Sequence, residues 1–202
     1  RQSTSALEVV VHRLYNPEGI TQYNIVPGLL GVILQLTMVM MTSMALTRET
    51  ERGTMENLLA MPASPLEIML GKVLPFLVVG GVQVLVVLVA AKTLFGVPFV
   101  GSLWLLLISI LIFVLALVLL GYAFSTLART QMQAMQLTFF FFLPSLQALG
   151  ENFPLTHFLR IIRAVMLKGA DLQGVATPLG ALMVFVAAYM VLALMRFRRT
   201  LD

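Results

Sequence analysis

The chain has 202 residues, of which 59% are apolar and 11% charged, and its mean hydropathy is +0.97. This composition lies far outside the range of soluble globular domains, so the sequence predicts a membrane protein. The net charge of +4 would be compatible with a nucleic-acid surface, but the 13 Lys and Arg residues are scattered at segment ends and do not gather on one face, which argues against one.

Residues 1–24 are polar and show no signal-peptide pattern. They begin without Met, so we expect the sequence to start inside a longer protein. Within them LEVVVHRLY predicts a strand and NPEG fits a type I turn. We interpret residues 1–24 as the end of an external α/β domain.

Five apolar runs follow, each close to the roughly 20 residues that a helix needs to cross the hydrocarbon core. They cover residues 25–46, 73–94, 103–127, 132–149 (the weakest) and 178–195. No Asp or Glu lies inside any run, which disfavours an ion-coupled carrier, because such carriers place ionisable groups at membrane depth. The sequence therefore predicts an all-α polytopic membrane domain over 25–202 with about five transmembrane helices.

The positive charges indicate the orientation of the chain in the membrane only where they lie in short connections between spans. Seven Lys and Arg residues fall on one side of an alternating arrangement and six on the other, which is not decisive. Short connections carry more weight, and Arg129 and the RFRR cluster after the last run lie on the same side. We therefore expect segments 48–72 and 128–131 and the C-terminus in the cytoplasm.

The connection 48–72 holds four of the nine acidic residues. Its segment Ser64-Pro65-Leu66-Glu67 fits a capping box with Pro at the first helical position, which predicts a helix that starts at Pro65 and continues through Gly71, Lys72 and Pro75 into the second run. Gly71-Lys72 also resembles the end of a phosphate-binding loop, but Val73 replaces the required Ser or Thr.

Upstream of this capping box, apolar and charged residues alternate at helical spacing. The apolar side has Met55, Leu58, Leu59 and Pro62, and the charged side has Glu51, Arg52 and Glu56. This pattern predicts a short amphipathic helix at the membrane surface. It is either a docking element for a partner or a loop resting on headgroups, and the pattern alone does not separate the two.

Residues 155–169 predict a second amphipathic helix, interfacial and on the outer side. Its apolar face has Phe158, Ile161, Ile162, Val165 and Met166, opposite Arg160, Arg163 and Lys168. The chain has no cysteine and two histidines, which excludes disulfides, thiolate metal sites and an imidazole cluster. The hydrolase motifs HExxH and GxSxG are also absent.

Several motifs resemble, in the same order, those of the ABC type-2 permeases, the membrane halves of bacterial ATP-binding cassette exporters of type V. They are YNPEG followed by NIVPGLLG, then RETERGTMENLLAMPASPLEIMLGK, LFGVPFVGS, STLARTQMQAMQ, PLTHFLRIIRAVMLKGA and RFRRTLD. The similarity covers nearly the whole chain. Members of that family usually have six spans with a large external domain between the first two, and this sequence lacks the first span and most of that domain.

The resemblance implies that segment 48–72 carries the coupling helix, which seats in a cleft of the ATPase subunit. The residues in contact with the ATPase would be Glu51, Arg52, Gly53, Thr54, Glu56 and Leu58. The chain itself would have no catalytic site, metal or cofactor, since ATP and Mg would bind the cytoplasmic nucleotide-binding partner. It would pair with a second permease copy or a homologous permease, as a dimer in the bacterial inner membrane.

The uncharged polar residues of the runs allow two interpretations. These residues are Gln35, Thr37, Thr42, Gln83, Gln136 and Thr138. Most such residues hydrogen-bond to neighbouring helices. Alternatively, Gln35, Met38, Thr42 and Gln136 line a substrate pathway, since related exporters use the helices that carry them. Met40, Met41 and Met44 would make its wall adaptable.

The function predicted from these features is ATP-driven export of an amphiphile, namely a drug, a lipid or an envelope component. The alternative is a non-transporting membrane scaffold or regulatory subunit that recruits a cytoplasmic partner.

Overall fold

The computed structural model of the chain describes residues 21–53, 65–94, 96, 99–147 and 153–199. The secondary structure of this part is helical: α1 Thr21–Glu51, α3 Pro65–Thr93, α4 Leu103–Ser125, α5 Gln131–Gln147, α6 Pro154–Lys168 and α7 Leu172–Arg199. The predicted start at Pro65 is confirmed, and α3 continues through Pro75. The predicted strand and turn before residue 20 and the predicted amphipathic helix beyond Gly53 lie outside the described residues.

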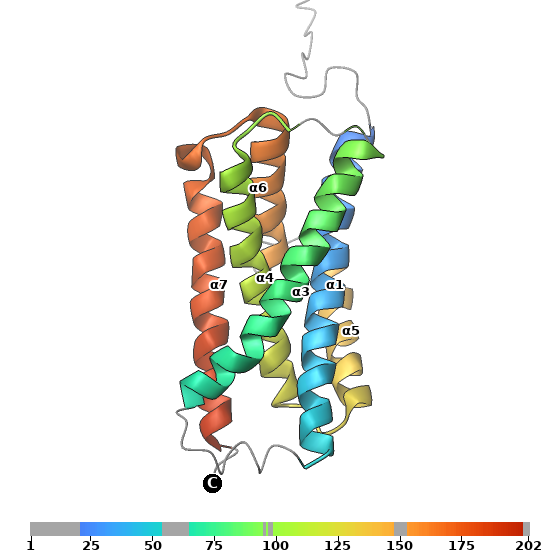
Figure 1. Cartoon of the computed structure of the whole chain (residues 1–202), viewed down its shortest axis with the longest axis vertical. Coiled ribbons are helices and arrows are strands. Elements are labelled where there is room, and N and C mark those ends of the chain that lie inside the picture. The colour runs from blue at the N-terminus through green and yellow to red at the C-terminus, as the bar shows by residue number, and fades with distance from the viewer. Residues whose placement is uncertain (1–20, 54–64, 95, 97–98, 148–152, 200–202) are drawn as a thin grey trace, which may run out of the picture.

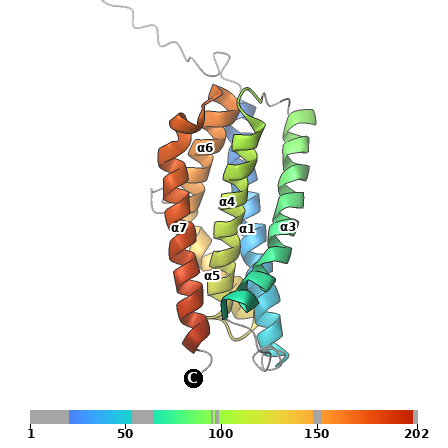
Figure 2. The ribbon, with the colours of Figure 1, turned by 60° about the vertical axis from the view of Figure 1, so that its left-hand side comes forward.

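The helices run side by side along one long axis (Figure 1). One end of this bundle, here called the base, holds the end of α1, the start of α3, the short α4–α5 connection and the end of α7. The other end is called the top. The three segments predicted to share one side of the membrane thus adjoin the same end of the bundle. Figure 2 shows α4 in the middle of the bundle, with α3 at one edge and α7 at the other.

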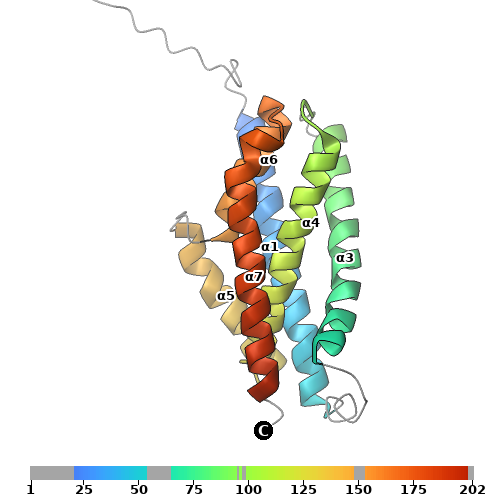
Figure 3. The same cartoon turned by 90° about the vertical axis from the view of Figure 1, so that its left-hand side faces the viewer.

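Four helices in the described residues are long and apolar enough to cross a membrane. They are Gly31–Glu51, Leu66–Thr93, Leu103–Ser125 and Leu172–Met195. The predicted span over 132–149 is not among them, because α5 has 17 residues and a crossing needs about 20. Figure 3 shows that α5 rises from the base and that α6 continues toward the top. Two short helices in succession therefore cover the distance that one long helix was predicted to cover.

Helix α4 is the central packing element. Ser102 caps its start, where the Ser102 side chain accepts a hydrogen bond from the Leu105 backbone N–H. Phe113 stacks on Phe158 of α6 with ring centroids 3.9 Å apart and planes 8° from parallel. Near the base, a Cβ on Gly121 would lie 2.9 Å from the Val39 carbonyl oxygen of α1. The absence of a side chain at Gly121 is what allows α1 and α4 to approach so closely.

The two faces of α6 are those that the sequence predicts. The five apolar residues, Phe158, Ile161, Ile162, Val165 and Met166, are buried, and Arg160, Arg163 and Lys168 are exposed. The orientation of α6 differs from that of a helix lying flat in the membrane interface, because α6 runs along the bundle axis (Figures 1 and 3). Its apolar face therefore packs on other helices of the protein. Gly169 ends α6 in the left-handed conformation, at φ 63°.

Candidate functional site

The end of α1 is the first part of the candidate ATPase contact that the structure describes. Glu51 is the last residue of α1, and Arg52 and Gly53 follow it, all three exposed. Gly53 adopts the left-handed conformation at φ 69°, and its N–H donates to the Thr50 carbonyl oxygen at 3.1 Å. Glycine suits this position because a Cβ disfavours positive φ, so α1 ends here with a helix cap. The other candidates, Thr54, Glu56 and Leu58, lie outside the described residues.

Glu51 binds the start of α5. One carboxylate oxygen accepts a hydrogen bond from the Gln131 backbone N–H at 2.8 Å, and the other accepts from Gln131 Nε2 at 2.6 Å. The first N–H groups of a helix have no partner within the helix and favour a negative charge nearby. Glu51 thus caps α5 from 80 positions away in the chain, a role that the sequence did not reveal.

Two further side chains complete the start of α5. Thr130 Oγ1 accepts a hydrogen bond from the Gln133 N–H at 3.2 Å, and Gln133 Oε1 accepts from the Arg129 N–H at 2.9 Å. This reciprocal pair, a Thr followed three residues later by a Gln, is a variant of the capping box. The connection between α4 and α5 is therefore held in place by hydrogen bonds of its own side chains. The hydrogen bonds of Glu51 link it to the end of α1.

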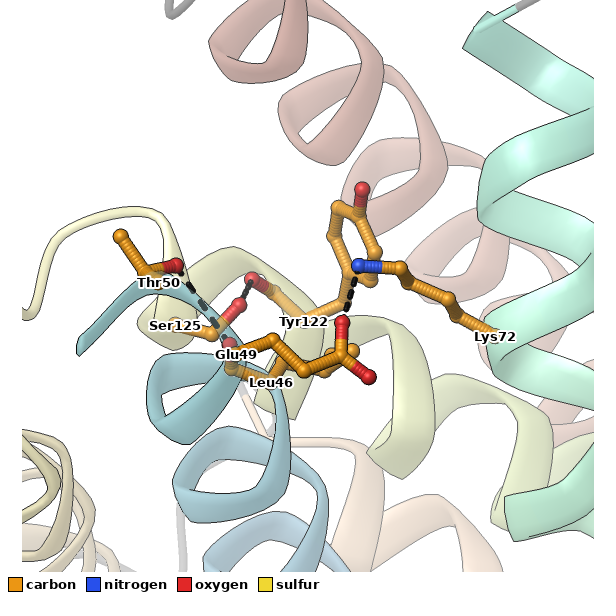
Figure 4. Close-up of polar contacts among 6 residues, drawn as sticks. All are labelled: Leu46, Glu49, Thr50, Lys72, Tyr122 and Ser125. Carbon is orange, nitrogen blue, oxygen red and sulfur yellow. Dashed lines mark hydrogen bonds and ion pairs between the residues drawn. The ribbon is translucent and has the colours of Figure 1, made fainter. Parts of the chain in front are cut away.

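A second carboxylate at the end of α1 contacts α3. Glu49 Oε2 forms an ion pair with Lys72 Nζ, two turns into α3 (Figure 4). The Lys72 side chain is only 9% exposed, whereas that of Glu49 is 40% exposed. A largely buried ammonium depends on such a partner, because its transfer from water is costly unless it is paired. Sequence reasoning missed this pair. Its one signal was an acidic residue near the end of one apolar run and a basic residue near the start of the next.

The four candidate pathway residues do not share one surface. Gln35, Met38 and Thr42 are fully buried on α1, whereas Gln136 is exposed on α5. Met38 lies beside Gly80 of α3, where a Cβ would come within 3.1 Å of the Met38 methyl carbon. Both polar atoms of the Gln35 amide and the Thr42 hydroxyl are buried without a hydrogen-bond partner. Of the three other methionines, Met41 is exposed and Met40 and Met44 are half-buried.

Other polar residues of the spans join neighbouring helices, as the structural interpretation predicts. Gln83 Nε2 of α3 donates to Thr37 Oγ1 of α1 at 2.6 Å. Ser43 of α1 and Thr138 of α5 share a hydrogen bond with their oxygens 3.4 Å apart. These contacts connect α1 to both α3 and α5.

The described residues contain a small apolar hollow and no cluster of three His, Asp or Glu side chains that could hold a metal ion. The hollow lies between α1, α3, α4 and α6. Its lining residues are Leu34, Val84, Val87, Leu88, Ile110, Phe158 and Ile162. Such a surface offers dispersion contacts to an apolar group and no hydrogen bond.

Comparisons with known proteins agree with the membrane character of the chain. The family model described as "ABC-2 family transporter protein" matches residues 2–195. "Probable multidrug ABC transporter permease YbhR" of Escherichia coli K12 is 33% identical over 208 aligned positions, which cover 95% of this chain and 56% of the relative. "Inner membrane transport permease YhhJ" of the same strain is 31% identical over 87% of this chain and 52% of the relative.

A third relative, "Probable multidrug ABC transporter permease YbhS" of Escherichia coli K12, is 33% identical over 79% of this chain and 42% of the relative. The chain thus spans about half the length of the curated relatives it matches. No solved structure matches. Together with four candidate spans, the family match indicates a multi-pass membrane protein.

Proposed function

Since the chain belongs to the ABC-2 family of transporter proteins, we propose that it is the permease part of an ATP-driven exporter in the bacterial inner membrane. In this proposal the base of the bundle faces the cytoplasm and contacts a separate ATPase subunit, which binds ATP and Mg. Closure of the ATPase on ATP moves the segment that follows α1 and tilts the spans. The permease works as a dimer with a second copy or a homologous permease.

The observation that carries this proposal is the arrangement at the base. The segment between α1 and α3 starts and ends there, next to the α4–α5 connection (Figure 1). Arg48, Arg52 and Arg129 are exposed at these helix ends. A partner that pushes on this segment therefore acts directly on the ends of α1 and α3, and through Glu51 on the start of α5. Arg129 lies in a short connection, where a positive charge indicates the cytoplasmic side most strongly, so it favours a cytoplasmic base.

We further propose that the cargo is an amphiphile and that Gln35, Met38, Thr42 and Gln136 line its pathway. For the three buried residues this requires α1 to separate from its neighbours during transport, namely from α3 beside Met38 and from α4 beside Thr42. The Gln35 amide and the Thr42 hydroxyl lack partners in the closed bundle, so they would gain hydrogen bonds to water or cargo on opening. Methionine side chains on α1 would suit cargo of varied shape.

The docking part of the proposal is tested by reversing one exposed charge. Arg52→Glu in the full-length permease, co-expressed with its ATPase, is expected to lower the amount of co-purified ATPase by about tenfold or more, since a like-charge contact costs several kcal/mol. The matched control is Lys92→Glu, an exposed charge at the top end of α3. Equal co-purification of the ATPase with both variants would contradict docking at the base.

The pathway part is tested by single cysteines at 35 and 136, because this chain has none of its own. Maleimide labelling at 35 should accelerate when the complex is trapped with ATP and vanadate, whereas 136 should label in both states. A scaffold predicts instead that position 35 stays protected in every nucleotide state.

A further inference from the structure

The last turn of α1 carries two carboxylates that point to different neighbours. Glu49 and Glu51 are two positions apart, which places them about 200° apart around a helix. Glu49 pairs with Lys72 of α3, and Glu51 binds Gln131 of α5. The end of α1 is therefore joined on one side to α3 and on another to α5.

The α3 side of this arrangement is partly buried. Lys72 is 9% exposed, and the Tyr122 ring of α4 lies beside the pair in Figure 4. A pair in such surroundings is screened less by water and salt than a surface pair is. Separating the two residues would leave the Lys72 ammonium largely buried without its carboxylate, which opposes independent movement of α1 and α3.

The contact with α5 is exposed, and its strength comes from the arrangement of its hydrogen bonds. Both oxygens of the Glu51 carboxylate are used, one on a backbone N–H and one on a side-chain amide of the same residue, Gln131. Hydrogen bonds to a charged acceptor are stronger than neutral ones, and two to one residue also fix direction. Helix α5 therefore follows the end of α1 in position and in orientation.

We propose that Glu49, Lys72, Glu51 and Gln131 form a two-armed clamp that makes the base ends of α1, α3 and α5 move as one unit. Only Arg52 and Gly53 separate the clamp from the segment that leaves α1. A displacement of that segment is thus delivered to α5 as well as to α1 and α3. All four residues position helices relative to one another, and Glu51 positions α5 through its hydrogen bonds to Gln131. The proposal rests on the proposed function, because it assigns the source of the displacement to the ATPase.

The test uses the full-length permease with its bound ATPase and a single cysteine at exposed Met132 of α5. With the clamp intact, trapping with ATP and vanadate should change the maleimide labelling rate at 132 by about fivefold or more, in the range of typical coupling between sites. In Gln131→Leu this nucleotide-dependent change should disappear, while the ATPase still co-purifies and hydrolyses ATP.

Gln133→Leu is the matched control, because it removes a hydrogen bond at the start of the same helix but none to α1. It should keep the nucleotide-dependent change. For the α3 arm, Glu49→Lys and Lys72→Glu should each abolish the change, and the double swap should restore it even where a single variant folds poorly.

Three results would overturn the clamp: a change at 132 that persists in Gln131→Leu, a change that is absent with the intact clamp, or a double swap that restores folding without restoring the change. Failure of the ATPase to co-purify with the unaltered permease would instead overturn the proposed function. The two failures are therefore distinguishable.

Discussion

Helices α3 and α4 are similar as sequences and very different in the bundle. Both are almost entirely apolar and both are long enough to cross a membrane. Yet 56% of the residues in the membrane-length window of α4 are buried, against 17% in α3. In lipid the hydrophobic effect does not favour protein contact over lipid contact, so apolarity does not say which helix lies inside. Small residues and polar contacts decide the position.

The two helices are also held differently. Helix α4 packs along its whole length, with large side chains such as Phe113 fully buried. Helix α3 buries a smaller share of its residues, and its polar and close contacts with α1 and α4 are the ion pair of Lys72, the close approach at Gly80 and the hydrogen bond of Gln83. Changes in α4 should therefore disrupt the whole bundle, and changes in α3 should loosen one edge of it.

The largest effect is expected at Gly121 of α4. A Cβ there would lie 2.8 Å from Thr42 Cβ and 2.9 Å from a backbone oxygen of α1, which cannot move aside as a side chain can. Gly121→Leu should abolish the monodisperse peak in detergent size-exclusion chromatography. The control is Gly180→Leu on exposed α7, where nothing lies within 4 Å of a Cβ. A normal peak for Gly121→Leu would mean that α1 and α4 are not packed as described.

A smaller effect is expected where α3 meets α4. In Gly80→Ala the new Cβ would lie 2.4 Å from Val114 Cγ1, so we expect a loss of about 1–3 kcal/mol, typical of overpacking. Neighbouring Gly81 has open space around its Cβ position, so Gly81→Ala should be neutral or stabilise by up to about 1 kcal/mol. Thermal inactivation in detergent measures both. Similar losses for the two alanines would contradict the contact of α3 at Gly80.

The loss of a hydrogen bond between two spans should lower stability less than the overpacking at Gly80 does. Gln83→Leu removes the 2.6 Å bond to Thr37 and is expected to cost about 0.6 kcal/mol, the average for such bonds in membrane proteins. A double-mutant cycle with Thr37→Val isolates the interaction, because each single change removes the same bond. Additive losses in the cycle would show that the two side chains do not interact.

The smallest effect is expected at Tyr122, on the buried side of α4. Its hydroxyl is buried without a hydrogen-bond partner among the described residues. Tyr122→Phe should therefore leave stability unchanged or raise it by up to about 1 kcal/mol, because an unsatisfied polar group is removed. A clear loss of thermal stability would indicate that the hydroxyl has a partner, such as an ordered water.

Hydropathy and capping patterns predicted much of the fold. Four of the five apolar runs correspond to spans, and α3 is described from Pro65, the helix start that the sequence predicts. The fourth run, 132–149, was wrong as a single span, since helix α5 ends at Gln147 after 17 residues. For α6 the pattern gave both faces correctly. It could not give what the apolar face contacts, because a periodic pattern is the same whether lipid or protein covers it.

The side-chain contacts at the end of α1 could not be predicted, and the reason is distance along the chain. Glu51 stands out as a charge beside a membrane span, but its partner Gln131 is 80 positions away and lies at no helical spacing from it. The pair of Glu49 and Lys72 likewise forms only after α1 and α3 have packed. Exposed Arg52 fits the predicted contact surface, and its role in docking remains a prediction.

The placement of charge along the spans has a consequence for the energy supply. In the four candidate spans, Asp, Glu, Lys and Arg lie only within about two turns of a helix end. A charge that crosses the membrane gains about 2.3 kcal/mol per 100 mV of membrane potential, but a charge that stays at one surface gains almost nothing. Rearrangement of these spans should therefore proceed equally well in polarised and in depolarised vesicles.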